Sequence, residues 1–288
     1  MSKVRPSADQ QELYGVARRV LLDAADAPAG HLDAMILVGA QAVYLRSADA
    51  GLSIAVFTAD ADLGIDLSLL GHDPRIEDAM RTAGFELGLD QPRPQPGTWF
   101  SQVIVGGTPQ SIPVDLLVPG RFAGTAPRRR SVNIPPHDKM SARKVDGLEL
   151  VTVDNDPMVV QSIEPEDDRS VRMKVAGPAA LLVAKAYKIR DRAADPNPSR
   201  AADKDAGDVM RLMRTCDATK VAATFSDLIR HDDPRIADTA RTGIALLVDQ
   251  FGRVRGPGVA LAQRSLAGAL PPDTIAGLAT AFVRQLPQ

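Results

Sequence analysis

The chain has 288 residues, of which 44% are hydrophobic and 24% charged, the usual balance of a globular protein with one large domain or two smaller ones. A formal net charge of -2 excludes a global basic field for nucleic acid, and the single Cys216 excludes a disulfide framework and a cysteine-cluster zinc site. Without an apolar run of membrane-spanning length or an N-terminal signal core, we expect a cytoplasmic protein with no membrane partner.

Helices and strands alternate along the first half of the chain. Helical spacing of apolar residues predicts helices, and short apolar or alternating runs predict strands. The expected helices are 8–26, 41–47 and one within 67–87 that is bounded by Pro74 and Gly84. The expected strands are 35–38, 54–67, 99–107, 110–120, 148–154 and 157–165, with a Gly-Thr-Pro turn between the third and the fourth.

The pattern becomes helical from Pro178 to the end of the chain. The expected helices are 178–192, 200–216, 219–230, 235–252, 257–269 and 272–286. We therefore predict an α/β (α+β) fold, with a mixed β-sheet and flanking helices over 1–175 and an all-helical domain over 176–288.

The stretch FTADADLGID places Asp60, Asp62 and Asp66 in a predicted strand, where aspartate is usually depleted. Asp60 and Asp62 are two residues apart, so on a strand both side chains point to one face. Close carboxylates repel one another unless a cation lies between them, and such oxygen ligands suit Mg²⁺. Asp115 on the strand SIPVDLLVPG could complete a two-metal phosphoryl-transfer centre. A solvated turn is the alternative, and we interpret Asp66 as a strand-end or capping residue.

The turn that follows strand 35–38 is a candidate phosphate site. Gly39 would let the backbone approach a phosphate closely, and the N-terminus of the next helix favours anions. A plain glycine turn is the alternative.

Two charged pairs mark the start of the helical half. Lys185 and Lys188 are three residues apart and share a helix face, as do Asp205 and Asp208 on the next helix. A lysine there could clamp the charge of a triphosphate while an aspartate orients it. An ordinary solvated charged face is the alternative.

Taken in order, the motifs VGAQAVYL, FTADADLGID, PVDLLVP and AALLVAKAYKIRDR…KDAGDVMRL resemble the nucleotidyltransferase superfamily of the DNA polymerase β type. Within it, the chain is most similar to the AbiEii/MenT branch of toxins, which belong to toxin–antitoxin and phage-exclusion modules. The resemblance covers roughly residues 30–215. It implies a nucleotidyltransferase-type sheet and Mg²⁺-dependent transfer of NMP from an NTP to RNA, especially a tRNA 3′ end. It also implies an antitoxin protein as a partner.

The resemblance implies a role for each matched residue. Asp60 and Asp62 would hold Mg²⁺, with Asp115 as a third ligand or base. The implied nucleotide contacts are Gly39, Ala40 and Gln41. The branch's later lysine and aspartate would correspond to Lys185, or Lys188, and to Asp205 or Asp208. The turn is Gly39-Ala40 where the superfamily has Gly-Ser, so a hydroxyl contact to phosphate is missing.

Two features bear on the acceptor and on control. A basic, proline-rich segment over 121–144 could guide RNA through phosphate contacts, or be a solvated loop. Its cations are Arg121, Arg128, Arg129, Arg130, Lys139, Arg143 and Lys144. Thr58 precedes Asp60 by two residues, and its phosphorylation could block NTP binding by adding negative charge.

Two other functions remain open. The acceptor could be a small molecule such as an aminoglycoside, which an acidic acceptor pocket would favour. Alternatively, the chain could be a non-catalytic module that binds a nucleotide or a partner protein, which the missing hydroxyl at Ala40 favours.

Overall fold

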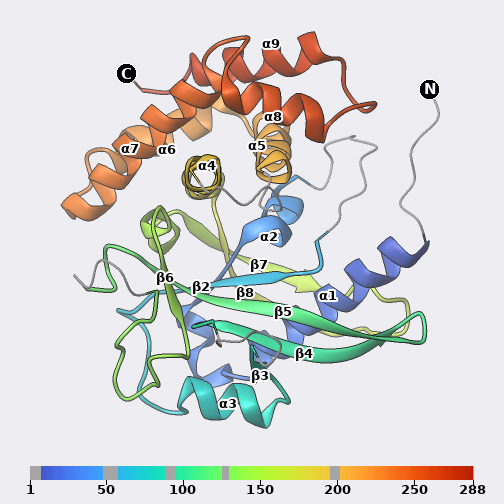
Figure 1. Ribbon diagram of the computed structural model, residues 1–288. Helices are drawn as coiled ribbons and strands as arrows, with labels where there is room; N and C mark the ends of the chain where they lie inside the picture. Colours follow the sequence, from blue (N-terminus) through green and yellow to red (C-terminus); the bar gives the residue numbers. More distant parts are fainter. Residues whose placement is uncertain (1–7, 48–57, 89–94, 125–129, 195–201, 288) are drawn as a thin grey trace. The chain divides into compact units, whose positions relative to one another are not determined.

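The computed structural model describes residues 8–47, 58–88, 95–124, 130–194 and 202–287 (Figure 1). In these residues a mixed sheet of eight strands occupies the N-terminal half, and the helices α4 to α9 follow it along the chain. The predicted α/β class, with a mixed sheet before a helical half, is confirmed.

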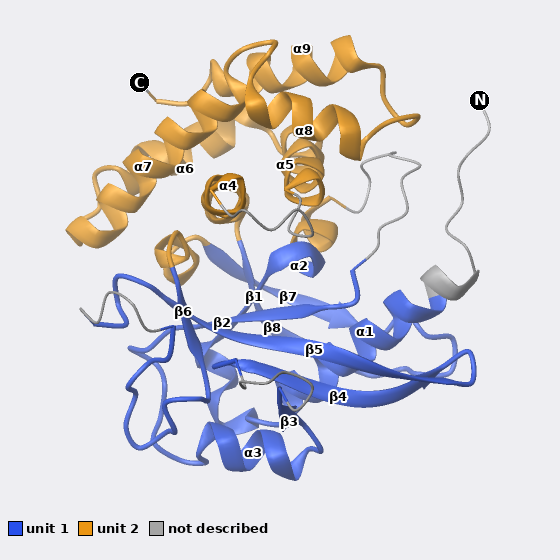
Figure 2. Cartoon of the chain, viewed as in Figure 1, with its two compact units in different colours: residues 1–42, 55–145, 155–176 blue, residues 43–54, 146–154, 177–288 orange. Residues whose placement is uncertain are grey.

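The chain forms two compact units, coloured separately in Figure 2. The first contains the described residues of 1–42, 55–145 and 155–176, and the second contains those of 43–54, 146–154 and 177–288. The second unit therefore includes two short segments that lie within the predicted first domain. The chain passes between the units several times, and the division is not a single boundary near residue 175.

The sheet belongs to the first unit. Its strands are β1 (Met35–Val38), β2 (Ala61–Ile65), β3 (Glu86–Leu87), β4 (Thr98–Val105), β5 (Thr108–Pro119), β6 (Arg143–Val145), β7 (Asn155–Gln161) and β8 (Ser170–Ala176). Their order is β3-β4-β5-β2-β1-β8-β7, and β6 pairs with β5 outside this order. β1 is antiparallel to β2 and parallel to β8, while β2 is parallel to β5.

The central strands explain the apolar runs of the sequence. All four residues of β1 are buried, as expected for a strand covered on both faces. β8 instead alternates, with Val171, Met173 and Val175 buried and Arg172 exposed. We did not predict β8, although its period of two was present in the sequence.

The helices of the sheet-containing half lie close to the predicted positions. They are α1 (Ala8–Asp26), α2 (Gly39–Arg46) and α3 (Ile76–Thr82), with the 3₁₀ helix η1 (Ala29–Ala34) leading into β1. α1 contacts β2, β4, β5 and β8, so its apolar stripe packs on the sheet. The boundary between the two units falls within α2.

Three details of the strands differ from the prediction. The expected strand over 54–67 is β2 alone, because 58–60 are not in a strand and 54–57 lie outside the described residues. The stretch 148–154 contains the 3₁₀ helix η2 (Glu149–Thr152) and no strand. The turn between β4 and β5 is formed by Gly106 and Gly107, whose φ values of 55° and 77° suit a two-residue hairpin.

The second unit is helical, as predicted from residue 178 onward. Its helices are α4 (Pro178–Ala193), α5 (Asp203–Thr215), α6 (Ala218–Leu228), α7 (Pro234–Phe251), α8 (Pro257–Ser265) and α9 (Pro272–Val283). Residues 200 and 201 of the expected second helix lie outside the described residues. Asp217 and Asp233 cap α6 and α7 through bonds to backbone N–H groups, which explains where these helices begin. None of the described helices has both the length and the apolar character that crossing a bilayer requires.

Candidate functional site

Gly39 forms the junction between β1 and α2. Its φ of 69° lies in the left-handed region that favours glycine. A Cβ atom at this position would collide with the carboxylate of Asp62, which is brought close because Asp62 is the register partner of Val38. Glycine is therefore needed both for the backbone conformation and for the close approach of Asp62. The carboxylate lies at the N-terminal end of α2, where the helix dipole stabilises negative charge.

Asp62 and Asp115 come from adjacent strands, as the sequence led us to expect. β2 and β5 are parallel, and these two residues are register partners. Register partners on neighbouring strands point to the same face of a sheet, so the two side chains lie side by side. Asp62 is 8% exposed.

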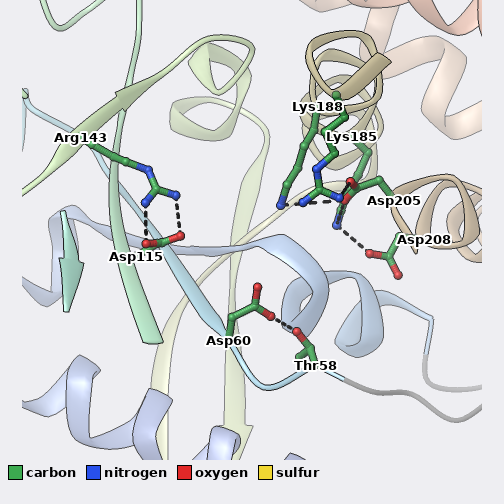
Figure 3. A network of polar contacts seen from close by, with 9 residues as sticks. Thr58, Asp60, Asp115, Arg143, Lys185, Lys188, Asp205 and Asp208 are labelled. Atoms are coloured by element: carbon green, nitrogen blue, oxygen red, sulfur yellow. Dashed lines mark hydrogen bonds and ion pairs between the residues drawn. The ribbon is translucent and has the colours of Figure 1, made fainter. Parts of the chain in front are cut away.

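The carboxylate of Asp115 is bound by Arg143 of β6 (Figure 3). Arg143 Nη1 and Nη2 donate to Asp115 Oδ1 and Oδ2 at 2.6 and 2.5 Å. Thr98 Oγ1 donates to Asp115 Oδ1 at 2.7 Å and accepts from Arg143 Nη1 at 2.7 Å. Both oxygens of Asp115 are thus engaged, which does not fit the predicted role of a third metal ligand. The sequence analysis placed Arg143 in a segment that could guide RNA. In the structure its side chain bonds to Asp115 and Thr98.

Asp60 precedes β2 and is not part of it. The predicted alternation that would align Asp60 with Asp62 therefore does not apply. The hydroxyl of Thr58 donates to Asp60 Oδ1, as Figure 3 shows, and the backbone carbonyl of Asp60 accepts from Gln41 Nε2 at 3.2 Å. Thr58 is fully buried, so its phosphorylation would require the hydroxyl to leave this environment first.

Gln41 is buried and bonded to protein groups on both sides of its amide. Its Oε1 accepts from Arg18 Nε at 2.8 Å, and its Nε2 donates to the carbonyls of Asp60 and Ala17 at 3.2 and 3.3 Å. Because arginine only donates, the atom that faces it must be the oxygen, which fixes the amide orientation. The predicted phosphate contact does not fit a side chain so engaged, whereas a role in positioning Asp60 does.

Arg18 is a residue of this site that the sequence analysis missed. It is 3% exposed, lies on α1, and also donates to the carbonyl of Gln161 and to the hydroxyl of Tyr14. The available signal was a charged residue next to Ala17 and close to Val20 on the apolar stripe of a predicted helix. Buried arginines are rare unless they are paired.

The expected metal triad is not assembled. Within the described ranges, no three histidine, cysteine, aspartate or glutamate side chains are grouped so that they could hold a metal ion. Asp115 is paired with Arg143, whereas Asp60 and Asp62 flank the start of β2. Asp115 therefore does not fit the predicted triad, and a Mg²⁺ site at Asp60 and Asp62 stays a prediction.

Asp66 follows β2 directly, where the strand ends. Its Oδ1 accepts from the backbone N–H and the hydroxyl of Ser68 at 3.0 and 2.6 Å. The interpretation of Asp66 as a strand-end residue is confirmed, since the carboxylate closes the turn after the strand.

The second unit contains a buried charge cluster between α4 and α5. Lys185 Nζ lies 2.7 Å from Asp208 Oδ2 and 3.1 Å from Asp205 Oδ1. Arg192 also bonds to Asp205, while Lys188 lies 3.9 Å from Asp205 with its side chain 42% exposed. The solvated-face alternative is wrong for Lys185, Asp205 and Asp208, which are all buried.

Burial and ion pairing act in opposite directions on this cluster. Burial disfavours the charged form of Lys185, but the carboxylates of Asp208 and Asp205 outweigh it and raise the pKa of the lysine. Burial likewise opposes ionisation of Asp205, yet the cations of Lys185, Lys188 and Arg192 lower the pKa of that carboxyl. Both groups are therefore charged at neutral pH and neutralise one another inside the unit.

Comparison with protein-family models and with curated proteins finds no match for this chain. The nucleotidyltransferase resemblance therefore stays a prediction that rests on the motifs of the sequence.

The basic segment is partly described. Arg128 and Arg129 lie outside the described residues, whereas Arg121, Arg130 and Lys139 are exposed. The backbone N–H of Lys144 donates to the carbonyl of Arg130 at 2.8 Å, which ties the segment to β6.

Proposed function

We propose that this chain is a nucleotidyltransferase toxin of the AbiEii/MenT type, which transfers NMP from an NTP to an RNA acceptor, a tRNA 3′ end. The observation that supports it best is the junction of β1, α2 and β2. There Gly39 has a positive φ, Asp62 lies against it, and Asp60 precedes the strand by one residue. The proposal includes a cytoplasmic location and an antitoxin protein as partner.

In the proposed reaction, the oxygen of the acceptor hydroxyl forms a bond to the α-phosphorus of the NTP. The bond from that phosphorus to the bridging oxygen breaks, pyrophosphate leaves, and the hydroxyl proton goes to solvent. Asp60 and Asp62 would hold Mg²⁺, which activates the hydroxyl and stabilises charge on the leaving group. The backbone N–H groups at Gly39 and Ala40, at the start of α2, would bind phosphate oxygens.

An RNA acceptor is supported by the exposed cations of the first unit. Arg121, Arg130 and Lys139 would attract phosphates and repel a cationic small molecule such as an aminoglycoside. The catalytic roles implied for Lys185, Asp205 and Asp208 stay predictions, because their pairing within the second unit is explained equally by a structural role.

The test is label transfer from each of the NTPs to total tRNA with purified protein and Mg²⁺. We expect one NTP to label tRNA and both Asp60→Asn and Asp62→Asn to abolish the transfer. The matched control is Asp66→Asn, since this aspartate belongs to the same segment but only closes a turn. Absence of label with every NTP, or equal activity of Asp60→Asn and wild type, would refute the proposal.

A nucleotide-binding module without catalysis is the second candidate. The ion pair between Asp115 and Arg143 favours it, because a neutralised third carboxylate weakens a two-metal centre. The alanine at position 40 favours it as well. This candidate predicts NTP binding with no transfer to any RNA.

A further inference from the structure

We propose that His31 and His137, which we call the histidine pair, hold loop 69–75 in place at neutral pH and release it when either ring takes up a second proton. Both residues belong to the first unit. The pair contains none of the residues assigned to the candidate site, so the inference goes beyond the proposed function and does not depend on it.

The histidine pair is buried, unlike His72, which is exposed in loop 69–75. His31 is 2% exposed and His137 is 6% exposed. His31 belongs to η1, whereas His137 lies in loop 134–141, which leads towards β6. Their rings meet edge to face, with centroids 5.5 Å apart and an angle of 89° between the planes. Folding therefore brings two titratable rings together from segments that are distant in the sequence.

Hydrogen bonds to the loop and to α3 fix where the protons of the pair are. Nε2 of His31 lies 2.6 Å from the carbonyl oxygen of Pro74, and Nε2 of His137 lies 2.9 Å from that of Gly71. A carbonyl oxygen only accepts, so Nε2 carries the proton on both rings. Nδ1 of His137 accepts from the backbone N–H of Ile76 at 3.2 Å and is therefore unprotonated. The pair thus binds three backbone groups in and next to the loop.

The pair has no place for a second proton while the loop is bound. At His137, a proton on Nδ1 would point at the N–H of Ile76 and break that bond. At His31, Nδ1 is buried and has no hydrogen-bond partner among the described residues, so the new N–H would find no acceptor there. A buried charge without a partner is costly, and two charged rings would also repel one another. Moving the loop away exposes the rings to water, which removes these costs.

The charged groups around the pair do not supply the missing acceptor. Glu77 of α3 is the acid whose charge acts on His137, but its Oε2 accepts from the N–H of Asp138 and the hydroxyl of Ser141 at 3.0 and 2.8 Å. Arg75 lies 3.9 Å from Oε1 of Glu77. The carboxylate is therefore paired, and it ties loop 134–141 to α3. Solvent screens the other charged groups on the elements around the pair, which are half-buried or exposed: Asp26, Asp33, His72, Asp73, Lys139 and Lys174.

Trp99 reports on loop 134–141. It is the only tryptophan of the chain, it is fully buried, and its Nε1 donates to the carbonyl of Ser141 at 3.0 Å. Release of loop 69–75 removes the partners of His137 at Gly71 and Ile76, so loop 134–141 loses two of its contacts. The surroundings of the indole ring should therefore change when the loop is released.

The experiment records Trp99 fluorescence and hydrogen–deuterium exchange of the full chain between about pH 8 and 5, the range in which histidine changes its charge. Exchange is corrected for the intrinsic pH dependence of amide exchange. We expect the corrected exchange of loop 69–75 to rise about tenfold towards the acid end, because one proton is taken up on release. The fluorescence should change over the same pH range, while α7 stays protected.

The double variant His31→Gln and His137→Asn separates the pair from other effects of acid. Glutamine keeps a donor for Pro74 and asparagine keeps an acceptor for Ile76, but neither takes up a proton. The variant should reduce the acid rise in exchange to less than about twofold. His72→Asn is the matched control, since this exposed histidine lies in the same loop, and it should keep the full rise.

An equal rise in the double variant and in wild type, or no rise in wild type, would overturn the inference. Exchange of α7 together with the loop would also overturn it, because acid would then unfold the chain as a whole. If the double variant does not fold at neutral pH, NMR titration of the ring protons of wild type decides. His31 or His137 must then titrate together with the rise in exchange, and a rise that follows His72 alone contradicts the proposal. None of these outcomes bears on label transfer at neutral pH, so the proposed function is tested separately.

Discussion

The side chain of Gln41 joins α1, α2 and the backbone of Asp60 in the first unit. It accepts from the buried Arg18 and donates to two carbonyls, so its removal would leave a buried cation short of one acceptor and two carbonyls short of donors. Buried polar groups without partners are costly. Gln41 therefore supports both the fold and the position of Asp60.

Gln41→Leu should lower the free energy of unfolding by about 1–3 kcal/mol, because Arg18 and the two carbonyls each lose one buried hydrogen-bond partner. Under the proposed function, it should also lower label transfer about tenfold, as Asp60 loses its backbone support. Urea denaturation and the tRNA assay measure the two effects. The control is Gln102→Leu at an exposed glutamine of β4, and an equal effect of both variants would contradict the assignment.

Lys185 neutralises two buried aspartates, so its loss is expected to destabilise the second unit. Lys185→Met should cost about 3–5 kcal/mol, because it leaves Asp205 and Asp208 charged and buried without their main cation. Lys188→Met is the matched control, since that lysine is more exposed and only 3.9 Å from Asp205. Thermal or urea unfolding separates the two variants, and similar stability would argue against a structural role.

The same cluster predicts the direction of a pH dependence. The pKa of Asp205 is lowered on folding. Its contribution to the free energy of unfolding is therefore present above the unfolded pKa of 3.8 and is lost as the pH falls through the lower folded pKa. The pKa of Lys185 is raised on folding. Its contribution to the free energy of unfolding is therefore complete below the unfolded pKa of 10.5 and is lost only as the pH rises through the higher folded pKa. The stability difference between wild type and Asp205→Asn should therefore be constant from about pH 5 to 9 and shrink in acid.

Two helices are capped by residues that are distant in the sequence. The backbone N–H of Ile76, at the start of α3, donates to His137 Nδ1 at 3.2 Å. The backbone N–H of Ala180, in the first turn of α4, donates to Asp154 Oδ2 at 2.7 Å. The N-cap residue of α4 is Gly177, which has no side chain to do this, and a Cβ there would collide with Asp154.

Asp154→Ala should therefore destabilise α4 and lower the free energy of unfolding by about 1 kcal/mol, the usual cost of a lost cap. Asp146→Ala provides the control, because this aspartate is exposed in the same segment. Urea midpoints measure the difference. Equal midpoints for the two variants would show that Asp154 does not cap the helix in solution.

The two compact units are interleaved along the chain. Residues 146–154 lie between segments of the first unit but contact the second. Glu149 accepts from the hydroxyl of Thr239 at 3.2 Å, Asp154 caps α4, and a Cβ at Gly147 would collide with the ring of Tyr187. These partners are far apart in sequence, which is why a boundary drawn from composition and periodicity missed the segment.

Under the proposed function, RNA binding through the first unit should depend on salt, despite the net charge of -2. Each phosphate contact contributes a slope of about -0.7 to -0.9 in the logarithm of affinity against the logarithm of salt concentration. Replacing the exposed Arg130 and Lys139 by alanine should reduce this slope by roughly 1.5 and weaken binding of all RNAs. Filter binding at several salt concentrations measures the slope for wild type and for the variant. Lys220→Ala with Arg230→Ala, on the helical unit, is the control, and an equal loss would place the contact elsewhere.

Much of the architecture was predictable from local signals. The helices of the second half, the strand 35–38 and the hairpin of β4 and β5 follow from apolar periodicity and turn residues, because these depend on neighbours along the chain. The turn at Gly39 was predicted in the same way, whereas its positive φ is a finding of the structure. β8 could also have been predicted, because its apolar and polar residues alternate along the sequence.

The partners of the charged side chains were decided by tertiary structure alone. Asp115 meets Arg143, Gln41 meets Arg18, and Asp154 caps α4. In each case the acidic or polar residue was visible in the sequence, but its side-chain oxygen can bind a metal ion or accept from an arginine or a helix end. Which of these it binds depends on strand register and helix packing, and these arise only when distant segments are brought together.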